Sequence, residues 1–408
     1  MTEIKPEFLS MGSAGQLMPQ EEMLEVKKQK KSVIIGIPKE TSFQENRVAL
    51  VPEAVGLLVQ NGHSVLIESD AGKAAHFPDN EFSDQGGQIV RSAEEAFKSD
   101  IILKVNPPSE REIEMLKKRQ TLISALNFTI HDHNFFKKLI SKKITAISFE
   151  FIKDKTGSFP VIRAMSEISG NTSVLIAAEY LSDIKYGKGR MLGGFSGITP
   201  TEVVILGAGT VGEFAARAAM GMGALVKVFD NSLYKLRNLQ NNLNSRIFTS
   251  IIQPKVLLKS LRTADVVIGA LHTSEGRTPV VVSEQMVMEM KKGSVIIDVS
   301  IDQGGCIETS HITNHSDPVY QMHDVTHYCV PNIASKVPHT ASYAFSNFFA
   351  PILLDLGEEG GIENKLKNDY GVRQGVYLYN GTLTNKFIGE YFGMPYRDIE
   401  LLMAAFHH

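Results

Sequence analysis

Short apolar runs alternate with amphipathic stretches along the first part of the chain. Such runs, spaced by helical patterns, predict strands connected by helices, and therefore βαβ units around a parallel sheet. Ser109 and Glu112 form a capping box that predicts the start of one of these helices. The expected strands are Val33–Ile37, Ser64–Glu68, Ile101–Val105, Gln120–Leu126 and Ile144–Phe151.

The same alternation continues after a long helix that we expect from Arg163 to about Leu181. Lys185–Pro200 is rich in glycine, which predicts a loop or a hinge. Residues from about 340 to 408 carry apolar side chains at helical spacing and are expected to be helical. The strands expected in between are Val203–Leu206, Leu225–Phe229, Asp265–Ala270, Ser294–Val299 and Tyr328–Val330.

These patterns predict an α/β fold with two Rossmann-like, doubly wound parallel-sheet domains and a cleft between them. The first domain is expected to be discontinuous, built from residues 33–162 and 339–408, and the second to span 163–338. Residues 1–32 are polar and lysine-rich toward their end. They are read as an extension, either an interface arm with one amphipathic helix or a disordered tail.

The most informative segment is the glycine turn Gly207-Ala208-Gly209-Thr210-Val211-Gly212, between an apolar strand and a helix. Gly207 permits the tight turn, Gly209 lets the backbone approach a pyrophosphate, and Gly212 lets the helix sit close to the sheet. The helix N-terminus faces the phosphates with free N–H groups. Asp230, after the next strand, would accept hydrogen bonds from the adenosine ribose and repel a 2′-phosphate. NAD is therefore predicted over NADP.

Composition narrows the class of protein without changing this picture. The 408 residues carry a net charge of -3, so neither a nucleic acid nor an anionic membrane is implied as a partner. The only two cysteines, Cys306 and Cys329, favour a reducing compartment. No cysteine or histidine spacing indicates a metal site. No apolar run approaches the ~18 residues of a membrane span, and no signal core is evident, so the cytoplasm is expected.

Four short segments at predicted strand ends or loops carry candidate chemistry. Arg47 could clamp a carboxylate, although a loop arginine is more often a surface ion pair. Lys104 lies in an apolar strand, so its ammonium either reaches solvent or meets an anion. Asp298 and Asp302 close a strand and could orient water, ammonia or an amine, or could simply form a turn. Asn332 could present its amide to a nicotinamide carboxamide or a substrate, or form an Asx turn.

The chain resembles the alanine dehydrogenases, and the related NAD-binding part of proton-translocating nicotinamide nucleotide transhydrogenases, over about residues 33 to 350. The resemblance is carried in order by VIIGIPKE, NRVALVPEAV, DIILKV, MSEISG, VVILGAGTVG, DVSIDQGG and HYCVPNI.

The resemblance implies roles for single residues. Arg47 corresponds to the arginine that holds the substrate carboxylate, and Lys104 to the lysine that contacts the carboxylate and the reacting oxygen. Asp302 resembles the aspartate that positions water or ammonia beside the nicotinamide. Ser166 resembles a serine that contacts the cofactor, and Lys235 a lysine near the adenosine ribose. Family enzymes form homo-oligomers, often hexamers.

One position departs from the family pattern. Alanine dehydrogenases carry a proton-exchanging histidine in the segment that here reads Ala125-Leu126-Asn127-Phe128. The amide of Asn127 can donate a hydrogen bond but cannot exchange a proton near neutral pH. His131 or His133 could substitute; otherwise Lys104 or a water must relay the proton.

The resemblance therefore implies an NAD-dependent dehydrogenase that converts L-alanine, NAD and water to pyruvate, ammonium and NADH. Asn127 keeps other interpretations open. One is a transhydrogenase-like component that exchanges hydride with a separate nucleotide-binding protein. Another is a nucleotide-binding protein without turnover, and a third is a dehydrogenase for a different amino or hydroxy acid.

Overall fold

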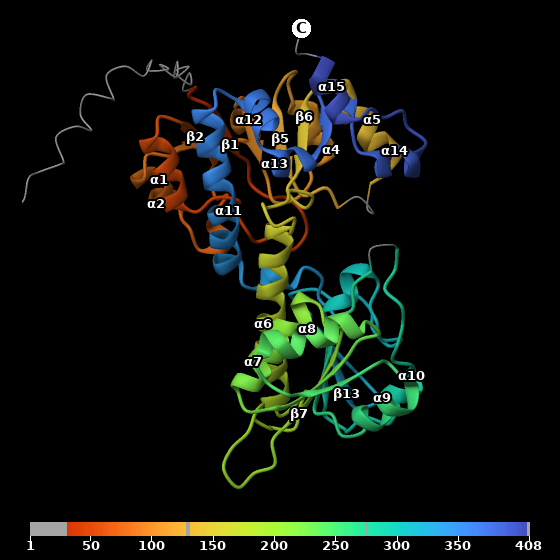
Figure 1. Cartoon of the computed structure of the whole chain (residues 1–408). Helices are drawn as coiled ribbons and strands as arrows, with labels where there is room; N and C mark the ends of the chain where they lie inside the picture. The colour runs from red at the N-terminus through yellow and green to blue at the C-terminus, as the bar shows by residue number, and fades with distance from the viewer. Residues whose placement is uncertain (1–30, 128–130, 274–275, 406–408) are drawn as a thin grey trace, which may run out of the picture.

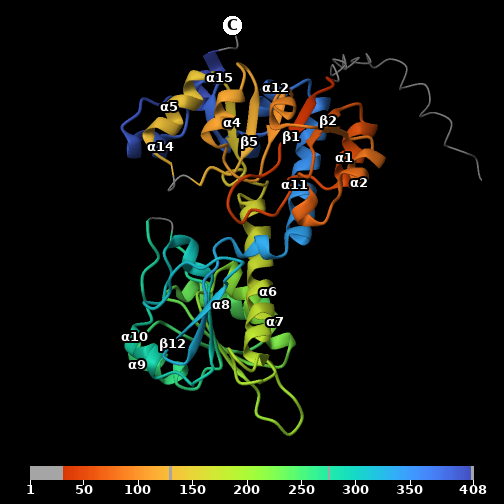
Figure 2. The same cartoon turned by 180° about the vertical axis from the view of Figure 1, so that it is seen from behind.

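The computed structural model describes residues 31–127, 131–273 and 276–405, and it shows two lobes joined by long helices (Figure 1). Each lobe is built on one twisted sheet with helices packed on its faces. Viewed from behind, α6 (Pro160–Ser182) runs from one lobe into the other, and α11 (Pro338–Glu358) begins at this junction and runs along the first lobe (Figure 2). This junction is called the waist below. The predicted α/β class with two Rossmann-like sheets is confirmed.

The first sheet has eight strands in the order β15-β14-β6-β5-β4-β1-β2-β3. Strands β1 to β6 are parallel, whereas β14 and β15 add an antiparallel edge. The bounds are β1 Ile34–Ile37, β2 Ser64–Glu68, β3 Gln88–Val90, β4 Ile101–Leu103, β5 Thr121–Ser124, β6 Thr145–Ser148, β14 Val376–Tyr379 and β15 Thr382–Leu383.

Helices from both ends of the chain cover this sheet. The capping box predicted at Ser109 is present at the start of α4, where the Ser109 and Glu112 side chains cap each other's backbone N–H groups. The helices are α1 Pro52–Gln60, α2 Asp79–Asp84, α3 Ala93–Ala96, α4 Glu110–Met115, α5 His133–Ser141, α12 Ile362–Asn368, α13 Tyr370–Gln374, α14 Lys386–Phe392 and α15 Ile399–Ala405, with a 3₁₀ turn at Lys73–Ala75.

The second sheet has seven strands in the order β12-β13-β11-β10-β7-β8-β9, all parallel except the edge strand β12. Its central strands are almost wholly apolar and buried, as parallel strands covered on both faces require. The elements are β7 Glu202–Leu206, α7 Thr210–Gly221, β8 Leu225–Phe229, α8 Leu233–Leu243, β9 Phe248–Ser250, α9 Pro254–Leu261, β10 Val266–Gly269, α10 Glu284–Met288, β11 Val295–Asp298, β12 Val319–Met322 and β13 Val325–Tyr328, with 3₁₀ turns at Val299–Gln303 and Ile333–Lys336.

Two long helices join the sheets. Helix α6 packs along α7 in the second lobe and against α11 at the waist, and α11 packs on α1 in the first lobe. The chain therefore leaves the first sheet through α6 and returns to it through α11. This path supports our proposal that the domains divide at residues 162 and 338. The N-terminal segment up to residue 30 lies outside the described residues.

Several expectations about elements were wrong. The strands expected at Ile101–Val105, Gln120–Leu126 and Ile144–Phe151 are the shorter β4, β5 and β6. The tail after residue 340 is not helical throughout, because β14 and β15 form a hairpin at Val376–Leu383. Its turn is Asn380-Gly381, both with positive φ (48° and 79°), and Asn-Gly between apolar residues is a strong hairpin signal. The strand expected at Tyr328–Val330 is observed earlier in the chain, as β13 at Val325–Tyr328. It begins directly after the turn at His323 and Asp324, both of which have positive φ.

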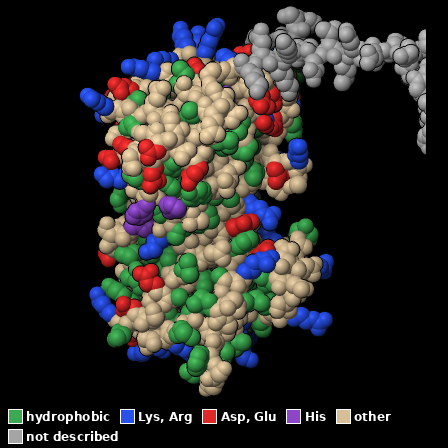
Figure 3. Space-filling view, turned by 90° about the vertical axis from the view of Figure 1, so that its left-hand side faces the viewer, with side chains coloured by type: hydrophobic (Ala, Val, Ile, Leu, Met, Phe, Trp, Pro, Cys, Tyr) green, Lys and Arg blue, Asp and Glu red, His purple; other side chains and the backbone are tan. Residues whose placement is uncertain are grey.

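Surface charge agrees with the composition on the face that Figure 3 shows. Lysine and arginine side chains are interspersed with aspartate and glutamate there, without a broad patch of one sign. Among the described residues, no helix is long and apolar enough to cross a membrane.

Candidate functional site

The glycine turn between β7 and α7 has the geometry that a dinucleotide needs. Gly207 has φ +117°, and a Cβ there would collide with the carbonyl oxygen of Ala270 at the end of β10. A Cβ on Gly212 would collide with the Gly207 carbonyl oxygen, so α7 packs tightly on the turn. A Cβ on Gly209 would meet nothing within 4 Å. The open space therefore lies above Gly209, at the N-terminus of the 12-residue helix α7, where a pyrophosphate would approach.

Asp230 follows β8 and secures this turn. Its carboxylate accepts hydrogen bonds from the backbone N–H of Ala208 (2.8 Å) and of Ser232 (2.8 Å), and the residue is 6% exposed. Each carboxylate oxygen keeps a lone pair, so the group can still accept from a ribose hydroxyl. Lys235 lies in the first turn of α8 and is exposed. These residues fit a nicotinamide dinucleotide.

A pocket opens between the two sheets beside this turn. Its empty volume is about 700 Å³, including space open to solvent. It brings together four predicted residues from separate segments: Arg47, Ser166, Asp302 and Asn332. The remaining lining comes from α6, α7 and the ends of β10, β11 and β13: Ile162, Met165, Ser169, Val211, Ala270, Leu271, His272, Val299, Ser300, Gln303, Ile333 and Ala334.

The loop that carries Arg47 is fixed by buried serines on the returning segment of the chain. Ser335 Oγ accepts from the Asn46 N–H (3.0 Å), and in α11 Ser342 Oγ accepts from the Val48 N–H (3.0 Å). Ser346, one helical turn later, accepts from the Val51 N–H (2.7 Å). These bonds satisfy backbone donors that would otherwise be buried without partners. The arginine loop therefore depends on α11 for its position.

Arg47 is held by Glu45, whose side chain is completely buried. Arg47 Nε donates to Glu45 Oε1 (2.6 Å), and Arg47 Nη2 donates to Glu45 Oε2 (2.5 Å). Nη1 lies 3.4 Å from Met165 Sδ, and the guanidinium carbon lies 5.2 Å from the centre of the Phe345 ring. The sequence left open a surface ion pair, but Arg47 is only 8% exposed and lines the pocket.

Asp302 and Asn332 meet at the other wall. Asn332 has φ +55°, and its backbone N–H donates to Asp302 Oδ1 (2.8 Å). The Asp302 side chain is exposed to the pocket, but surrounding protein removes much of its water. This desolvation raises the pKa of Asp302, against the opposing effects of the Asn332 N–H and the charge of Arg47. Asp302 is thus close enough to Arg47 to interact with its charge.

Lys104 is not among the residues that line this pocket. It follows β4 and is 1% exposed, with Nζ 2.7 Å from Glu112 Oε1 and 3.3 Å from Glu40 Oε2. Burial acts to lower the pKa of Lys104, but Glu40 and Glu112 more than offset it and the pKa is raised. Burial raises the pKa of Glu40, and Lys104 opposes that shift. The ammonium is therefore charged and paired in this conformation.

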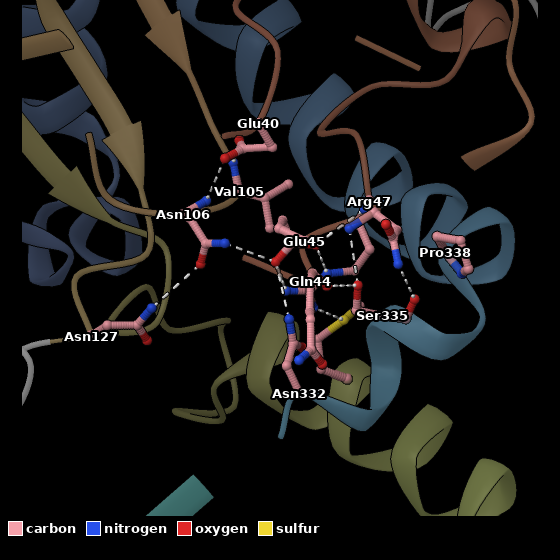
Figure 4. A network of polar contacts seen from close by, with 12 residues as sticks. Glu40, Gln44, Glu45, Arg47, Val105, Asn106, Asn127, Asn332, Ser335 and Pro338 are labelled. Atoms are coloured by element: carbon pink, nitrogen blue, oxygen red, sulfur yellow. Dashed lines mark hydrogen bonds and ion pairs between the residues drawn. The ribbon is translucent and has the colours of Figure 1, made fainter. Parts of the chain in front are cut away.

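Asn127 is exposed and adopts φ +43°. Its backbone N–H donates to Glu150 Oε2 (3.1 Å), and its Nδ2 donates weakly to Asn106 Oδ1 (3.4 Å). Asn106 Nδ2 donates in turn to Glu45 Oε2 (3.0 Å), so a chain of amides leads from Asn127 to the group that holds Arg47 (Figure 4).

The two nearby histidines do not take the place of the family histidine in this conformation. The His131 ring stacks on Phe135 with centroids 3.7 Å apart, and burial lowers its pKa. His133 is the first residue of α5. Phe128, the last residue of the departing segment, lies outside the described residues.

Three residues of the site were missed from the sequence. Glu45 and Asn106 lie two residues from Arg47 and Lys104, but a glutamate or asparagine beside a basic residue carries no specific signal. His272 lines the pocket just after β10. Burial lowers the pKa of His272, as does the charge of Lys235. Its position after a central parallel strand, where ligands bind such sheets, was the available signal.

Comparisons with known proteins agree with this geometry. The chain matches the family described as alanine dehydrogenase/PNT, N-terminal domain, over residues 36–169, and the corresponding C-terminal domain over residues 173–386. The alanine dehydrogenase of Staphylococcus saprophyticus is 36% identical over 369 residues, which cover 90% of this chain and 99% of that protein. Alanine dehydrogenase 2 of Staphylococcus aureus (strain USA300) is 36% identical over 367 residues, covering 90% and 98%.

Solved structures give the same result. An L-alanine dehydrogenase superposes with a TM-score of 0.81 at 36% identity, covering 88% of this chain and 99% of the other. A transhydrogenase from Sinorhizobium meliloti has a TM-score of 0.73 at 22% identity, covering 87% and 99%, and shares the fold.

Proposed function

The chain belongs to the alanine dehydrogenase/PNT family, and from this membership we propose that it catalyses the reversible oxidative deamination of L-alanine with NAD. In the forward direction alanine, NAD and water give pyruvate, ammonium, NADH and a proton. The relatives named alanine dehydrogenase support the general activity. NAD and the details of the reaction are part of the proposal.

One observation supports the proposal most strongly. Arg47 and Asp302, from different sheets, line the same pocket as Ser166 and as Val211 of the glycine turn. A guanidinium suits a carboxylate, and a carboxylate suits ammonium, an amine or water. The pocket therefore combines the groups that an amino or oxo acid needs with a wall suited to a dinucleotide.

Each residue has a proposed role. Arg47 binds the substrate carboxylate through the N–H groups that Glu45 leaves free. Asp302 accepts hydrogen bonds from water or ammonia and orients it toward the carbonyl carbon. Ser166 and the turn at Gly207, Gly209 and Gly212 hold the cofactor. When bound, NAD supplies the hydride acceptor at its nicotinamide ring.

Further cofactor contacts are proposed on the wall beside β8. Asp230 and Lys235 contact the adenosine ribose, and the Asp230 carboxylate disfavours a 2′-phosphate. The amide of Asn332 contacts the cofactor through the oxygen that its other contacts leave free.

The proton on the reacting oxygen needs a separate route. Asn127 donates a hydrogen bond to that oxygen but cannot take or give a proton near neutral pH. Lys104, the family's second substrate contact, could exchange the proton only after leaving Glu40 and Glu112, to which it lies within 3.3 Å. We therefore propose that water or Lys104 completes the transfer, at a lower rate than a positioned histidine would give.

The test is NADH oxidation with pyruvate and ammonium. The wild-type rate should require both substrates, and Arg47→Ala should abolish it while NADH binding and the folded state persist. A wild-type rate no higher than that of Arg47→Ala would overturn the proposal.

Asn127 also supports a second candidate, a nucleotide-binding protein that exchanges hydride between nucleotides and does not turn over alanine. Hydride exchange between nucleotides involves no oxo acid whose oxygen must gain or lose a proton. An amide in place of the histidine would then not impair the reaction. Hydride exchange between NADH and an oxidised nucleotide analogue, without a pyruvate-dependent rate, would favour it.

The proposal extends to the compartment and the assembly of the enzyme. The two unpaired cysteines support a cytoplasmic location, and the family supports a homo-oligomer, often a hexamer.

A further inference from the structure

Glu45 sits at the centre of the polar network in Figure 4. Besides Arg47, its carboxylate accepts from Asn106 Nδ2 (3.0 Å) and Asn332 Nδ2 (3.1 Å). Asn106 follows β4 in the first sheet, and Asn332 follows β13 in the second. A fully buried carboxylate is expensive unless it is paired and hydrogen-bonded, and here every contact is a donor. Glu45 therefore joins the two lobes at the pocket.

The contacts of Glu45 decide which part of Arg47 faces the pocket. A guanidinium has five N–H donors in a fixed plane. Glu45 takes the Nε–H and one Nη2–H. One Nη1–H faces Met165 Sδ at 3.4 Å, so the two donors that remain are one on Nη1 and one on Nη2. A carboxylate can still accept hydrogen bonds from these two donors.

Asn332 extends the arrangement to the opposite wall. Its side-chain Nδ2 donates to Glu45, while its backbone N–H donates to Asp302 Oδ1 (2.8 Å). Its left-handed φ of +55° is a conformation that asparagine tolerates better than most residues. Glu45 and Asn332 thus connect Arg47 with Asp302. Arg47 is the proposed contact of the substrate carboxylate, and Asp302 is the proposed contact of water or ammonia.

We propose that Glu45 and Asn332 form a positioning bridge that fixes Arg47 and Asp302 relative to each other and so sets the spacing between the carboxylate and the reacting carbon of a 2-oxo acid. The inference rests on the proposed function. Neither residue reacts; the bridge acts through Arg47 and Asp302.

The alternative is that Glu45 merely competes with the substrate for Arg47. The two interpretations predict opposite changes in pyruvate affinity when Glu45 is replaced. If Glu45 competes, Glu45→Gln frees the arginine and pyruvate binds more tightly. If Glu45 positions Arg47, the same change makes the guanidinium less firmly held, and pyruvate binds more weakly.

The first experiment measures pyruvate KM, kcat and NADH affinity for Glu45→Gln. The pyruvate KM should rise by roughly tenfold to a hundredfold, the range expected when a charge-assisted hydrogen bond is lost, and kcat should fall. NADH affinity should be unchanged. Glu202→Gln is the matched control, because Glu202 pairs with Lys227 at the start of β7 and does not line the pocket. An unchanged or lower pyruvate KM in Glu45→Gln would overturn the bridge.

The second experiment removes the other half of the bridge. Asn332→Gly keeps the positive φ and the backbone N–H but deletes the amide. Asn380→Gly, at φ +48° in the β14–β15 turn, is its control. The bridge predicts a rise in pyruvate KM, in addition to any loss of NADH affinity that follows from deleting the proposed contact of the amide with the cofactor. A loss of NADH affinity with an unchanged pyruvate KM would mean that Asn332 serves the cofactor alone.

A third measurement separates failure of the bridge from failure of the proposed function. A wild-type protein without pyruvate-dependent activity refutes the function and leaves the bridge testable by stability. The effects of Glu45→Gln and Asn332→Gly on denaturant unfolding should then be non-additive, because the two side chains contact each other. Additive effects would overturn the bridge. If Glu45→Gln does not fold, Asn106→Ala, which deletes one amide contact to Glu45, should raise the pyruvate KM by a smaller factor, and an unchanged KM would count against the bridge.

Discussion

Asn127 is the residue at which this chain departs from its family, and its surroundings show why a side chain of this kind is tolerated there. The residue is exposed, its φ of +43° suits asparagine, and Glu150 accepts its backbone N–H. Within the described part of the chain, the amide is held by the weak 3.4 Å bond to Asn106. The backbone is thus fixed while the side chain can be changed without breaking a strong contact.

This arrangement makes Asn127→His a gain-of-function test. A histidine can exchange a proton near neutral pH, and a general acid or base typically contributes about 10²–10⁴-fold in rate. We expect the rate of NADH oxidation with pyruvate and ammonium to rise by at least about tenfold, with NADH affinity unchanged. A folded variant that binds NADH but shows no gain would indicate that the pocket serves another substrate.

His327 provides a residue-scale prediction about pH. It is buried in β13, with Nε2 2.8 Å from Thr309 Oγ1 and Nδ1 3.0 Å from the Val325 carbonyl oxygen. Burial lowers its pKa from 6.5 to about 4. Between these values the unfolded chain binds a proton that the folded chain does not, so stability is lost as the pH falls from 6.5 to 4.

The loss from this one group is at most about 3 kcal/mol. His327→Asn should therefore flatten the fall in unfolding free energy between pH 6.5 and 4, measured by denaturant titration at each pH. A residual slope is expected, because burial also lowers the pKa of His63, His131, His272 and His315. An equally steep curve in the variant would show that His327 is not the group responsible.

At the scale of elements, two glycines of the turn between β7 and α7 allow NAD binding and stability to be tested separately. Gly209 has φ -80°, which alanine can adopt, and a Cβ there points into open space. Gly209→Ala should weaken NAD binding by about tenfold or more, because the methyl group occupies the approach to the helix N-terminus, while the melting temperature changes little. Gly212→Ala should lower the melting temperature, since its Cβ would collide with Gly207. Calorimetric NAD titration with thermal unfolding distinguishes the two; equal NAD affinity in Gly209→Ala and wild type would argue against a pyrophosphate here.

The elements also show what the sequence could predict. The parallel strands β2 and β8 were predicted with their observed bounds, because a mainly apolar run between turn residues has few other interpretations. The β14–β15 hairpin was missed because the tail was judged by apolar spacing, although Asn380-Gly381 was a readable turn signal. For the site, the sequence located Arg47 and Asp302, but the contacts of Glu45 to Asn106 and Asn332 arise only when distant strand ends meet.

At the scale of the whole molecule, α6 connects the two lobes, and the serines of α11 hold the arginine loop of the first lobe. The segment between α6 and β7 projects from the second lobe (Figure 1) and exposes apolar side chains: Ile184 (92%), Met191 (58%), Phe195 (67%) and Ile198 (63%). An exposed apolar group of this kind indicates a surface that another chain covers.

We therefore expect the proposed homo-oligomer to use this segment. Sedimentation should give a mass several times the 45.0 kDa of one chain. Changing Phe195 and Ile198 together to aspartate should reduce that mass, whereas Ile312→Asp, at a site with 67% exposure elsewhere, should not. A monomeric wild-type protein would contradict the prediction.

The proposed enzyme transfers hydride in the pocket between the nicotinamide ring and the α-carbon of alanine. The direct measurement uses NADH with deuterium at either face of nicotinamide C4, together with pyruvate and ammonium, and analyses the products by mass spectrometry. We predict alanine with one deuterium at Cα from one labelled form and none from the other. Unlabelled alanine from both forms, a hydroxy acid in place of alanine, or no alanine at all would contradict the account.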